Sequence, residues 1–208
     1  MGNMTSAGGT PGRTGTLGPG RVNQKQRTRT AIVKATRRLA RTGGEITMPL
    51  VAREALVSEA TAYRYFPDLA SLLREADDGS WPDPAEALAP VAGSDDPVER
   101  VAHAAEFLLR GVLSNQGAVR AMIAASITKP PAAERPGHRF GLIDFALRPL
   151  AGRLAAEALA QLRRDLAVVM SAEARFTLMD LCGLEPGAAI ASGVETARRV
   201  TRAAVGIS

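Results

Sequence analysis

The residue types on which enzymes and metal sites depend are scarce in this chain of 208 residues. It has one cysteine and two histidines, and neither His103 nor His138 stands near a cysteine or acid cluster at ligand spacing. We therefore expect both histidines at the surface, and neither an enzyme nor a cofactor or metal site. A lone cysteine cannot form a disulfide within the chain. We interpret Cys182, which lies in an apolar segment, as a small buried residue in a reducing compartment.

Long hydrophobic runs are also absent. No stretch of about eighteen apolar residues occurs, so we expect no membrane span, and the Gly-, Thr- and Arg-rich first residues lack the apolar stretch of a secretory signal. Basic residues in the segment 24–41 share it with a narrow stripe of mostly small residues, which argues against a membrane-surface helix. Cytoplasmic residence follows as the expectation. The 46% hydrophobic composition suffices to build a core without disulfides.

No strand-type alternation and no repeat is present, whereas apolar residues recur throughout at helical spacing. The pattern predicts an all-α fold. Residues 84–91 read either as a short helix or as part of a linker, and Trp81 either anchors that junction or lines a cavity. The predicted helices are about 24–41, 48–55, 59–66, 68–77, 97–113, 116–127, 138–154, 158–182 and one that starts at Pro186.

Positive charge is concentrated in the first third of the chain. Residues 1–66 hold eleven Arg and Lys against three acids, a net charge of +8, while the remainder carries −3. A basic end on a mildly acidic body is typical of a protein that touches a polyanion with one end. Residues 1–23 are too poor in large apolar residues to fold, so we expect a disordered basic arm there.

Two short helices are predicted within residues 42–76. Thr47 can cap the first helix and Ser58 the second, with Leu56 in the turn between them. On the second helix, Ala62 and Phe66 should turn inward while the residues between face outward. This is a helix-turn-helix pattern, although periodicity alone fits any small helical hairpin. Exposed tyrosines beside an arginine suit hydrogen bonding to phosphate and sugar.

The run VSEATAYRYFPDLASLL, residues 57–73, resembles the recognition-helix signature of the TetR family of transcriptional regulators. Valine-serine, a threonine, tyrosine-x-tyrosine-phenylalanine and the following leucines stand in matching order. The chain departs from the family at Leu56, where glycine is usual, and at Leu69, where lysine is usual. The first departure predicts either a turn without a left-handed residue or a strained leucine. The second removes a phosphate contact.

The resemblance implies about nine helices, with a three-helix DNA-binding domain at 24–76 and a ligand-binding and dimerisation domain at 77–208. It also implies that the last two helices form a four-helix bundle with those of a second copy. Small residues such as Ala191, Gly193 and Ala197 would allow a close helix approach there. The alternative is that these helices complete the core of a single chain.

The expected site residues form two groups. Three candidate DNA contacts are expected at phosphates, and they are Thr47, Thr61 and Tyr63. Four are expected at base edges, and they are Ser58, Glu59, Arg64 and Tyr65. Glu59 could instead repel phosphate. Adaptable apolar side chains could surround a ligand in the second domain, although core packing explains them equally well; they are Phe107, Met122, Ile123, Phe145, Met170 and Phe176.

The sequence thus predicts a homodimeric regulator that binds a palindromic double-stranded DNA operator. We expect a repressor that an unknown small molecule releases from its operator. Two alternatives stay open. One is an architectural or non-specific DNA-binding protein without a ligand, and the other is a helical enzyme or carrier whose head has lost DNA binding.

Overall fold

The computed structural model describes residues 19–79, 81–128 and 137–206, and all regular elements in these ranges are helices. The predicted all-α fold is confirmed. None of the described helices has the length and apolar character needed to cross a membrane. The elements are α1 (Pro19–Arg41), α2 (Met48–Glu54), α3 (Glu59–Tyr65), α4 (Leu69–Asp77), α5 (Pro84–Ala87), η1 (Ala89–Val91), α6 (Pro97–Ser114), α7 (Gln116–Thr128), α8 (His138–Ala146), η2 (Arg148–Leu150), α9 (Ala156–Val169), α10 (Ala172–Asp180) and α11 (Pro186–Val205).

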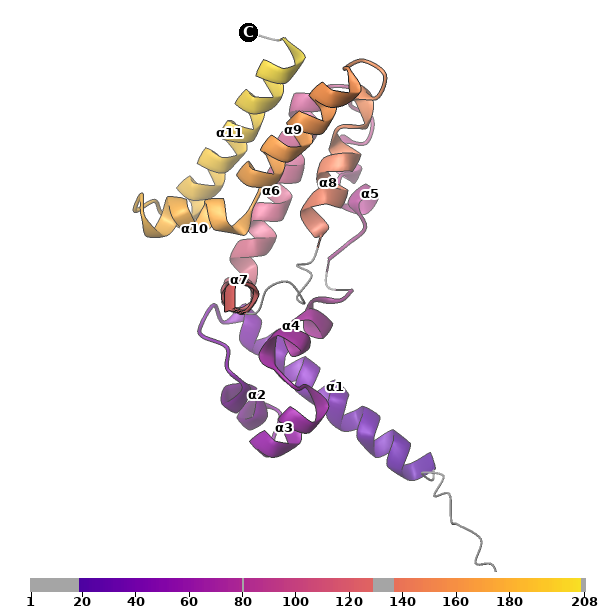
Figure 1. Cartoon of the computed structure of the whole chain (residues 1–208), viewed down its shortest axis with the longest axis vertical. Helices are drawn as coiled ribbons and strands as arrows, with labels where there is room; N and C mark the ends of the chain where they lie inside the picture. Colours follow the sequence, from indigo (N-terminus) through magenta and orange to yellow (C-terminus); the bar gives the residue numbers. More distant parts are fainter. Residues whose placement is uncertain (1–18, 80, 129–136, 207–208) are drawn as a thin grey trace, which may run out of the picture.

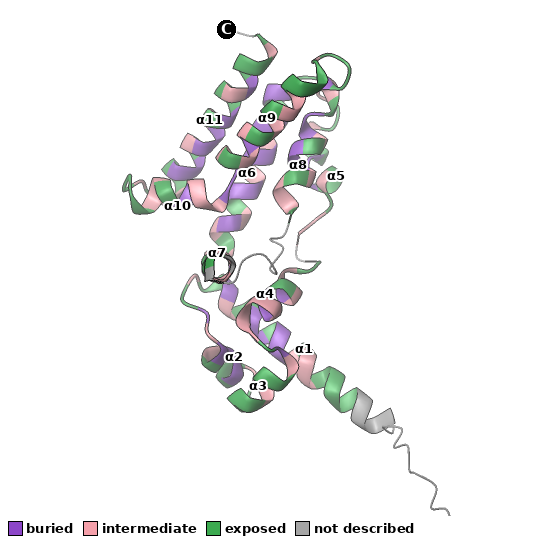
Figure 2. Cartoon of the chain, in the orientation of Figure 1, coloured by how far each residue is buried: buried purple, intermediate pink, exposed green. Residues whose placement is uncertain are grey.

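Helices α1 to α4 form the smaller unit, which we call the head (Figure 1). Its apolar core joins the inner stripe of α1 to the buried residues of the three short helices. Ile32, Val51, Ala62 and Leu72 are each fully buried there. The N-terminal end of α1 extends beyond the head (Figure 2). The side chains from Asn23 to Arg27 there are exposed.

Helices α5 to α11 form the larger unit, the body, in which α6 is the central helix. The predicted apolar stripe of α6, from Val101 through Leu108 to Val112, is buried throughout. Helix α11 packs along α6, and α8 and α9 cover other sides of the same core. Gly193 permits the close approach of α11, because a Cβ atom there would lie 2.8 Å from a Leu109 methyl carbon.

Helix α7 joins the two units. It packs against α1 and α4, and its Ala118 belongs to the core of the head. Gly117 lies so close to the head that a Cβ atom on it would stand 2.2 Å from the Gly44 carbonyl oxygen. The expected boundary at residue 77 separates α4 from α5 along the sequence. In space, however, the core of the head also includes residues of α7, a helix of the body.

Several predicted boundaries differ from the observed ones. Helix α1 begins at Pro19, so the part of the expected arm that remains, residues 1–18, lies outside the described residues. The helix predicted over 138–154 ends at Ala146 and continues as η2. The helix predicted over 158–182 breaks after Val169, and Ser171 caps a new helix. Residues 84–91 form α5 and η1, so the short-helix alternative holds.

Two burial predictions were wrong, namely that Cys182 is buried and that the helix at 116–127, which is unusually apolar, is buried on most sides. Cys182 is exposed in the turn after α10, because that turn leaves the core before α11 returns to it. Helix α7 is not buried on most sides. Ile127 is 69% exposed, and Arg120 and Ala124 also face outward, because α7 bridges head and body rather than lying inside either.

Candidate nucleic-acid interface and junction cavity

The α2–turn–α3 unit is fixed by caps at both helix starts. The Thr47 hydroxyl accepts a hydrogen bond from the Leu50 amide at 3.4 Å, and the Ser58 hydroxyl accepts one from the Thr61 amide at 3.1 Å. Such caps satisfy amides that the first turn leaves without partners. The predicted Ser58 cap and helix start are thereby confirmed.

Leu56 occupies the left-handed region in the turn between α2 and α3. Its φ of 57° is the one positive value among the non-glycine residues that the structure describes. Its side chain is also 91% exposed. Of the two predicted alternatives, the turn therefore has the left-handed leucine, and an L-residue with a Cβ pays a steric cost in this region.

Helix α3 presents a polar face away from the core. Ala62 is fully buried, while Glu59, Tyr63 and Arg64 are exposed. The Arg64 guanidinium stands over the Tyr65 ring at 5.6 Å from its centroid. This face can offer a guanidinium fork, a phenol and a carboxylate to a partner, which are groups able to bond phosphates and base edges.

Tyr65, Thr61, Ser58 and Thr47 are less available than the sequence suggested. Tyr65 is half-buried and packs against the core of the head. The Ser58 hydroxyl donates to the Thr61 hydroxyl at 2.9 Å while it caps α3. Thr47 and Ser58 cap helix starts, and Thr61 bonds the Ser58 cap, so any contact of these three residues with a partner uses only the hydrogen-bonding capacity that remains.

Arg29 on α1 holds the C-terminal end of α3 in place, a role that the sequence did not predict. Its guanidinium donates to both Glu75 carboxylate oxygens and to the Tyr65 carbonyl oxygen. It also stands over the Phe66 ring, 4.5 Å from the centroid. The hydrogen bond with Glu75 holds the pKa of Arg29 above its ordinary value. This basic residue is therefore part of the structure of the head itself, with its charge paired within the chain.

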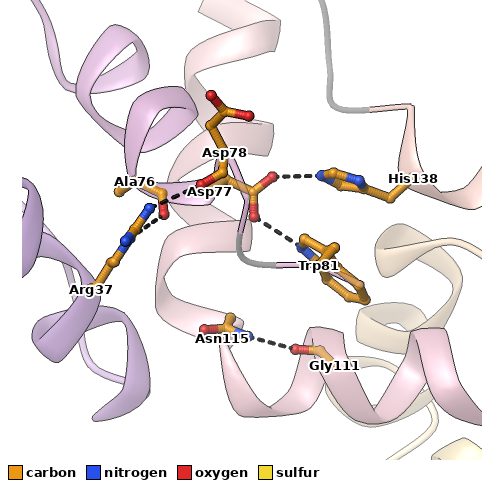
Figure 3. A network of polar contacts seen from close by, with 8 residues as sticks. All are labelled: Arg37, Ala76, Asp77, Asp78, Trp81, Gly111, Asn115 and His138. Atoms are coloured by element: carbon orange, nitrogen blue, oxygen red, sulfur yellow. Dashed lines mark hydrogen bonds and ion pairs between the residues drawn. The ribbon is translucent and has the colours of Figure 1, made fainter. Parts of the chain in front are cut away.

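Two more α1 arginines also have partners inside the protein. Arg37 donates to the Ala76 and Asp78 carbonyl oxygens at the end of α4 (Figure 3), and Arg38 bonds Glu54 of α2 at 2.7 Å. The other described cations of α1 are exposed, and they are Lys25, Arg27, Lys34 and Arg41. The charge available to a polyanion is thus smaller than the net +8 suggests.

A cavity of about 90 Å³ lies at the junction of head and body. Three of the six candidate ligand residues, Met122, Ile123 and Met170, line it. A second cavity of about 70 Å³ shares Val119 and Met122 with it and extends between α7 and the helices α1 and α4. The full lining of the first cavity is Asp77, Trp81, Leu108, Val112, Val119, Met122, Ile123, His138, Arg139, Met170, Ala172 and Glu173.

The three candidate phenylalanines do not line this cavity, because other side chains cover them. Phe107 packs edge-on against Trp81, with ring centroids 6.2 Å apart. Phe145 lies under the guanidinium of Arg148, 4.0 Å from the ring centroid. Phe176 lies under Arg120 at 3.9 Å. For these three residues, packing within the body is the observed role.

Asp77 organises one end of the cavity. Its carboxylate accepts a hydrogen bond from Trp81 Nε1 at 2.9 Å and lies 2.8 Å from His138 Nε2 (Figure 3). The Trp81 and His138 rings stack with centroids 5.3 Å apart, and Gly111 makes room for the indole. Trp81 therefore both anchors the junction and lines the cavity. His138 is half-buried, as is His103, whose Nε2 lies 3.1 Å from the Ala87 carbonyl oxygen.

The body buries two arginines in different ways. Arg100 is 4% exposed and donates to five carbonyl oxygens. Arg175 is 1% exposed, and its three guanidinium nitrogens donate to no atom of the described residues. Burial lowers the pKa of Arg175, the nearby positive charge of Arg120 lowers it further, and Asp180 acts in the opposite direction.

An ion pair connects α7 to α10. Arg120 donates to both Asp180 carboxylate oxygens at 2.8 Å, and these hydrogen bonds lower the pKa of the Asp180 carboxyl. Because α7 packs on the head and α10 on α6 and α11, this pair is one of the links between the two units.

The small-residue stripe of the last helix packs within the chain. Gly193 and Ala197 are buried against the body core, whereas Ala191 is exposed. The alternative interpretation, in which this stripe completes the core of a single chain, is correct for Gly193 and Ala197. Nearby exposed apolar side chains are Val168 on α9, 71% exposed, and Leu181 after α10, 81% exposed.

The described residues hold no cluster of three or more His, Cys, Asp or Glu side chains that could bind a metal ion. Neither a protein-family model nor a curated protein matches the sequence.

Proposed function

We propose that this protein is a transcriptional regulator of the TetR type, which binds double-stranded operator DNA through α3. The observation that supports this most strongly is the exposed Glu59–Tyr63–Arg64 face on a helix of seven residues. Ser58 caps its start, and Arg29 bonds the carbonyl group at its last residue. A short polar helix fixed at both ends suits insertion of its N-terminal part into a major groove.

The exposed side chains of α3 are suited to two kinds of contact, with base edges and with phosphates. Arg64 is suited to guanine and Glu59 to the amino group of cytosine, whereas the Tyr63 hydroxyl is suited to phosphate. Lys25, Arg27, Lys34 and Arg41 on α1 add affinity that does not depend on sequence. The half-buried Tyr65 contributes mainly by supporting Arg64.

The active form is a homodimer that assembles through the segments 156–180 and 186–205. Exposed apolar side chains on these segments are Val168 and Ala191, and Leu181 is exposed in the turn between them. Two heads must lie about one DNA turn, roughly 34 Å, or a multiple of it apart to enter successive major grooves. A two-fold axis then requires a palindromic operator.

A small molecule that binds in the junction cavity releases the operator, so that the protein acts as a cytoplasmic repressor without a cofactor. Because α7 borders both cavities and packs on the head, a ligand that displaces α7 would change the position of the head. The ligand must bind one arrangement of the heads better than the other, since equal affinity shifts nothing.

Selection of bound sequences from a random DNA pool tests the proposal. We expect enrichment of an inverted repeat whose half-sites are centred roughly ten base pairs, or a multiple of that, apart. A pool that stays random while the protein still binds it would support the architectural alternative and contradict the regulator.

A further inference from the structure

Arg175 is the most unusual charged group among the described residues. An arginine keeps its charge at any ordinary pH, and a buried charge is costly unless hydrogen bonds or an opposite charge compensate it. Arg100, buried to a similar extent, meets this requirement with five carbonyl oxygens. All three nitrogens of Arg175 are buried without a hydrogen-bond partner in the described part of the chain, and the guanidinium carbon lies 5.8 Å from the centroid of the Phe176 ring.

Arg175, Arg120 and Asp180 form a group of two positive charges and one negative charge. Arg120 lies close enough to lower the pKa of Arg175, and its own guanidinium covers the Phe176 ring. Asp180 is the carboxylate that acts on Arg175, but both of its oxygens accept hydrogen bonds from Arg120. A second anion at this place would therefore be attracted by two guanidinium groups.

The junction cavity begins one helical turn away. Ala172 and Glu173, in the first turn of α10, line the cavity, and Arg175 follows Ala172 by three residues on the same helix. Residues three apart are neighbours along one side of a helix. Most of the lining is apolar; its charged or titratable members are Asp77, His138, Arg139 and Glu173. The Asp77 carboxylate stands at the His138 and Trp81 side of the cavity.

The cavity is small for a ligand. Its volume of about 90 Å³ compares with roughly 30 Å³ of liquid for each water molecule and with roughly 300 Å³ or more for pockets that hold drug-sized ligands. Arg175 is not among the lining residues, so a ligand that reaches it must widen the cavity along α10, past Ala172.

From this combination we infer that the body binds a small apolar molecule that carries a carboxylate, with the carboxylate paired to Arg175. The apolar part occupies the space lined by Leu108, Met122 and Met170. The carboxylate accepts the two parallel hydrogen bonds that a guanidinium fork offers. This deepens the proposed function, on which it rests only for the ligand's role as effector. Displacement of α10 would reach the head through the Arg120–Asp180 pair and α7.

The test measures binding to the full chain without DNA, by calorimetry and by the midpoint of thermal unfolding. The probes are hexanoate, 1-hexanol, hexylamine and inorganic phosphate at equal ionic strength, extended by branched and aromatic monocarboxylates of two to ten carbons. We expect at least one carboxylate to bind about tenfold or more tightly than its matched alcohol, as a charged hydrogen bond implies. Phosphate and the amine should bind no better than the alcohol.

Two variants locate the anion. Arg175→Met should fold, because an apolar side chain of similar length suits the buried site, and it should reduce the preference for carboxylate to near one. Arg199→Met removes a charge from an exposed position of α11 and should leave the preference unchanged. The inference is overturned if no carboxylate is preferred by the wild type, if phosphate or the amine binds best, or if Arg175→Met keeps the preference.

The two proposals can fail separately. A carboxylate preference that depends on Arg175, in a protein that selects no DNA sequence, would refute the proposed function and keep the inference. Selective DNA binding without any carboxylate preference would do the reverse.

Discussion

The head and the body order their helices in different ways. In the head, α2, α3 and α4 each begin at a side chain that caps them, namely Thr47, Ser58 and Asp68. In the body, side chains cap α5, α6 and α10, but α8, α9 and α11 begin without a side-chain cap bond and rely on packing in the body core. The comparison teaches that each short helix of the head begins at a local cap, whereas α8, α9 and α11 of the body depend on contacts distant in sequence.

Replacement of Phe66 with alanine should have the largest effect on this comparison. Phe66 is 1% exposed and carries Arg29 on its ring, so the variant should lose about 3–5 kcal/mol of the free energy of unfolding. Hydrogen exchange should show protection lost in the head before α6. Phe140→Ala, at a position 37% exposed in the body, is the control and should cost far less. Equal loss of protection in both units would contradict a locally ordered head.

Gly117→Ala tests the contact between the units. Its Cβ would stand 2.2 Å from a backbone oxygen of Gly44, so α7 or the loop must shift, at a cost of about 1–3 kcal/mol. Trp81 fluorescence should report the altered junction. Gly187→Ala meets no atom within 4 Å and should leave both stability and fluorescence nearly unchanged. Identical behaviour of the two variants would show that head and body do not need this close approach.

Ser58→Ala removes the cap of α3 and should lower the free energy of unfolding by about 1 kcal/mol, as measured by urea denaturation. Thr196→Ala removes an exposed hydroxyl that bonds a carbonyl oxygen within α11, and it should change stability by less than the cap variant. A cap variant as stable as the wild type would mean that α3, too, depends on packing alone.

The variant with the smallest expected effect should increase the free energy of unfolding rather than lower it. Leu56→Gly relieves a left-handed leucine and should stabilise the protein by a few tenths of a kcal/mol to about 1 kcal/mol, because the relief of about 1–2 kcal/mol exceeds the entropy cost of glycine. Leu181→Gly is the matched control, since Leu181 is 81% exposed but has a φ of −104°, and it should destabilise. Thermal unfolding of both variants decides whether strain is stored at Leu56.

The head was largely predictable because its signals are local. Ser58 and Asp68 mark helix starts by chemistry that acts within three residues. The departure from glycine at Leu56 left two alternatives, and the structure has the left-handed leucine. The body was predictable where Pro97 and Pro186 open α6 and α11. The break at Ser171 was missed, although the Ser171 side chain caps α10, because apolar residues continue through it.

The rest required contacts that sequence spacing does not reveal. Arg29 belongs to the basic first third of the chain, but its charge is paired with Glu75, which lies 46 residues away in the sequence. Phe145 and Phe176 fitted an apolar cavity by residue type, but Arg148 and Arg120 cover their rings. The unpaired burial of Arg175 was equally invisible, since its helical position shows no pattern that separates it from a surface arginine.

The most direct test of the central claim is the ratio of affinities for selected and scrambled DNA at one fixed salt concentration. For a sequence-reading head we expect a ratio of about 10³ or more. Arg64→Ala should shift the preference at one base pair by about 1–3 kcal/mol, while Tyr63→Phe should weaken both affinities alike. A wild-type ratio near one would contradict the claim that α3 reads DNA sequence.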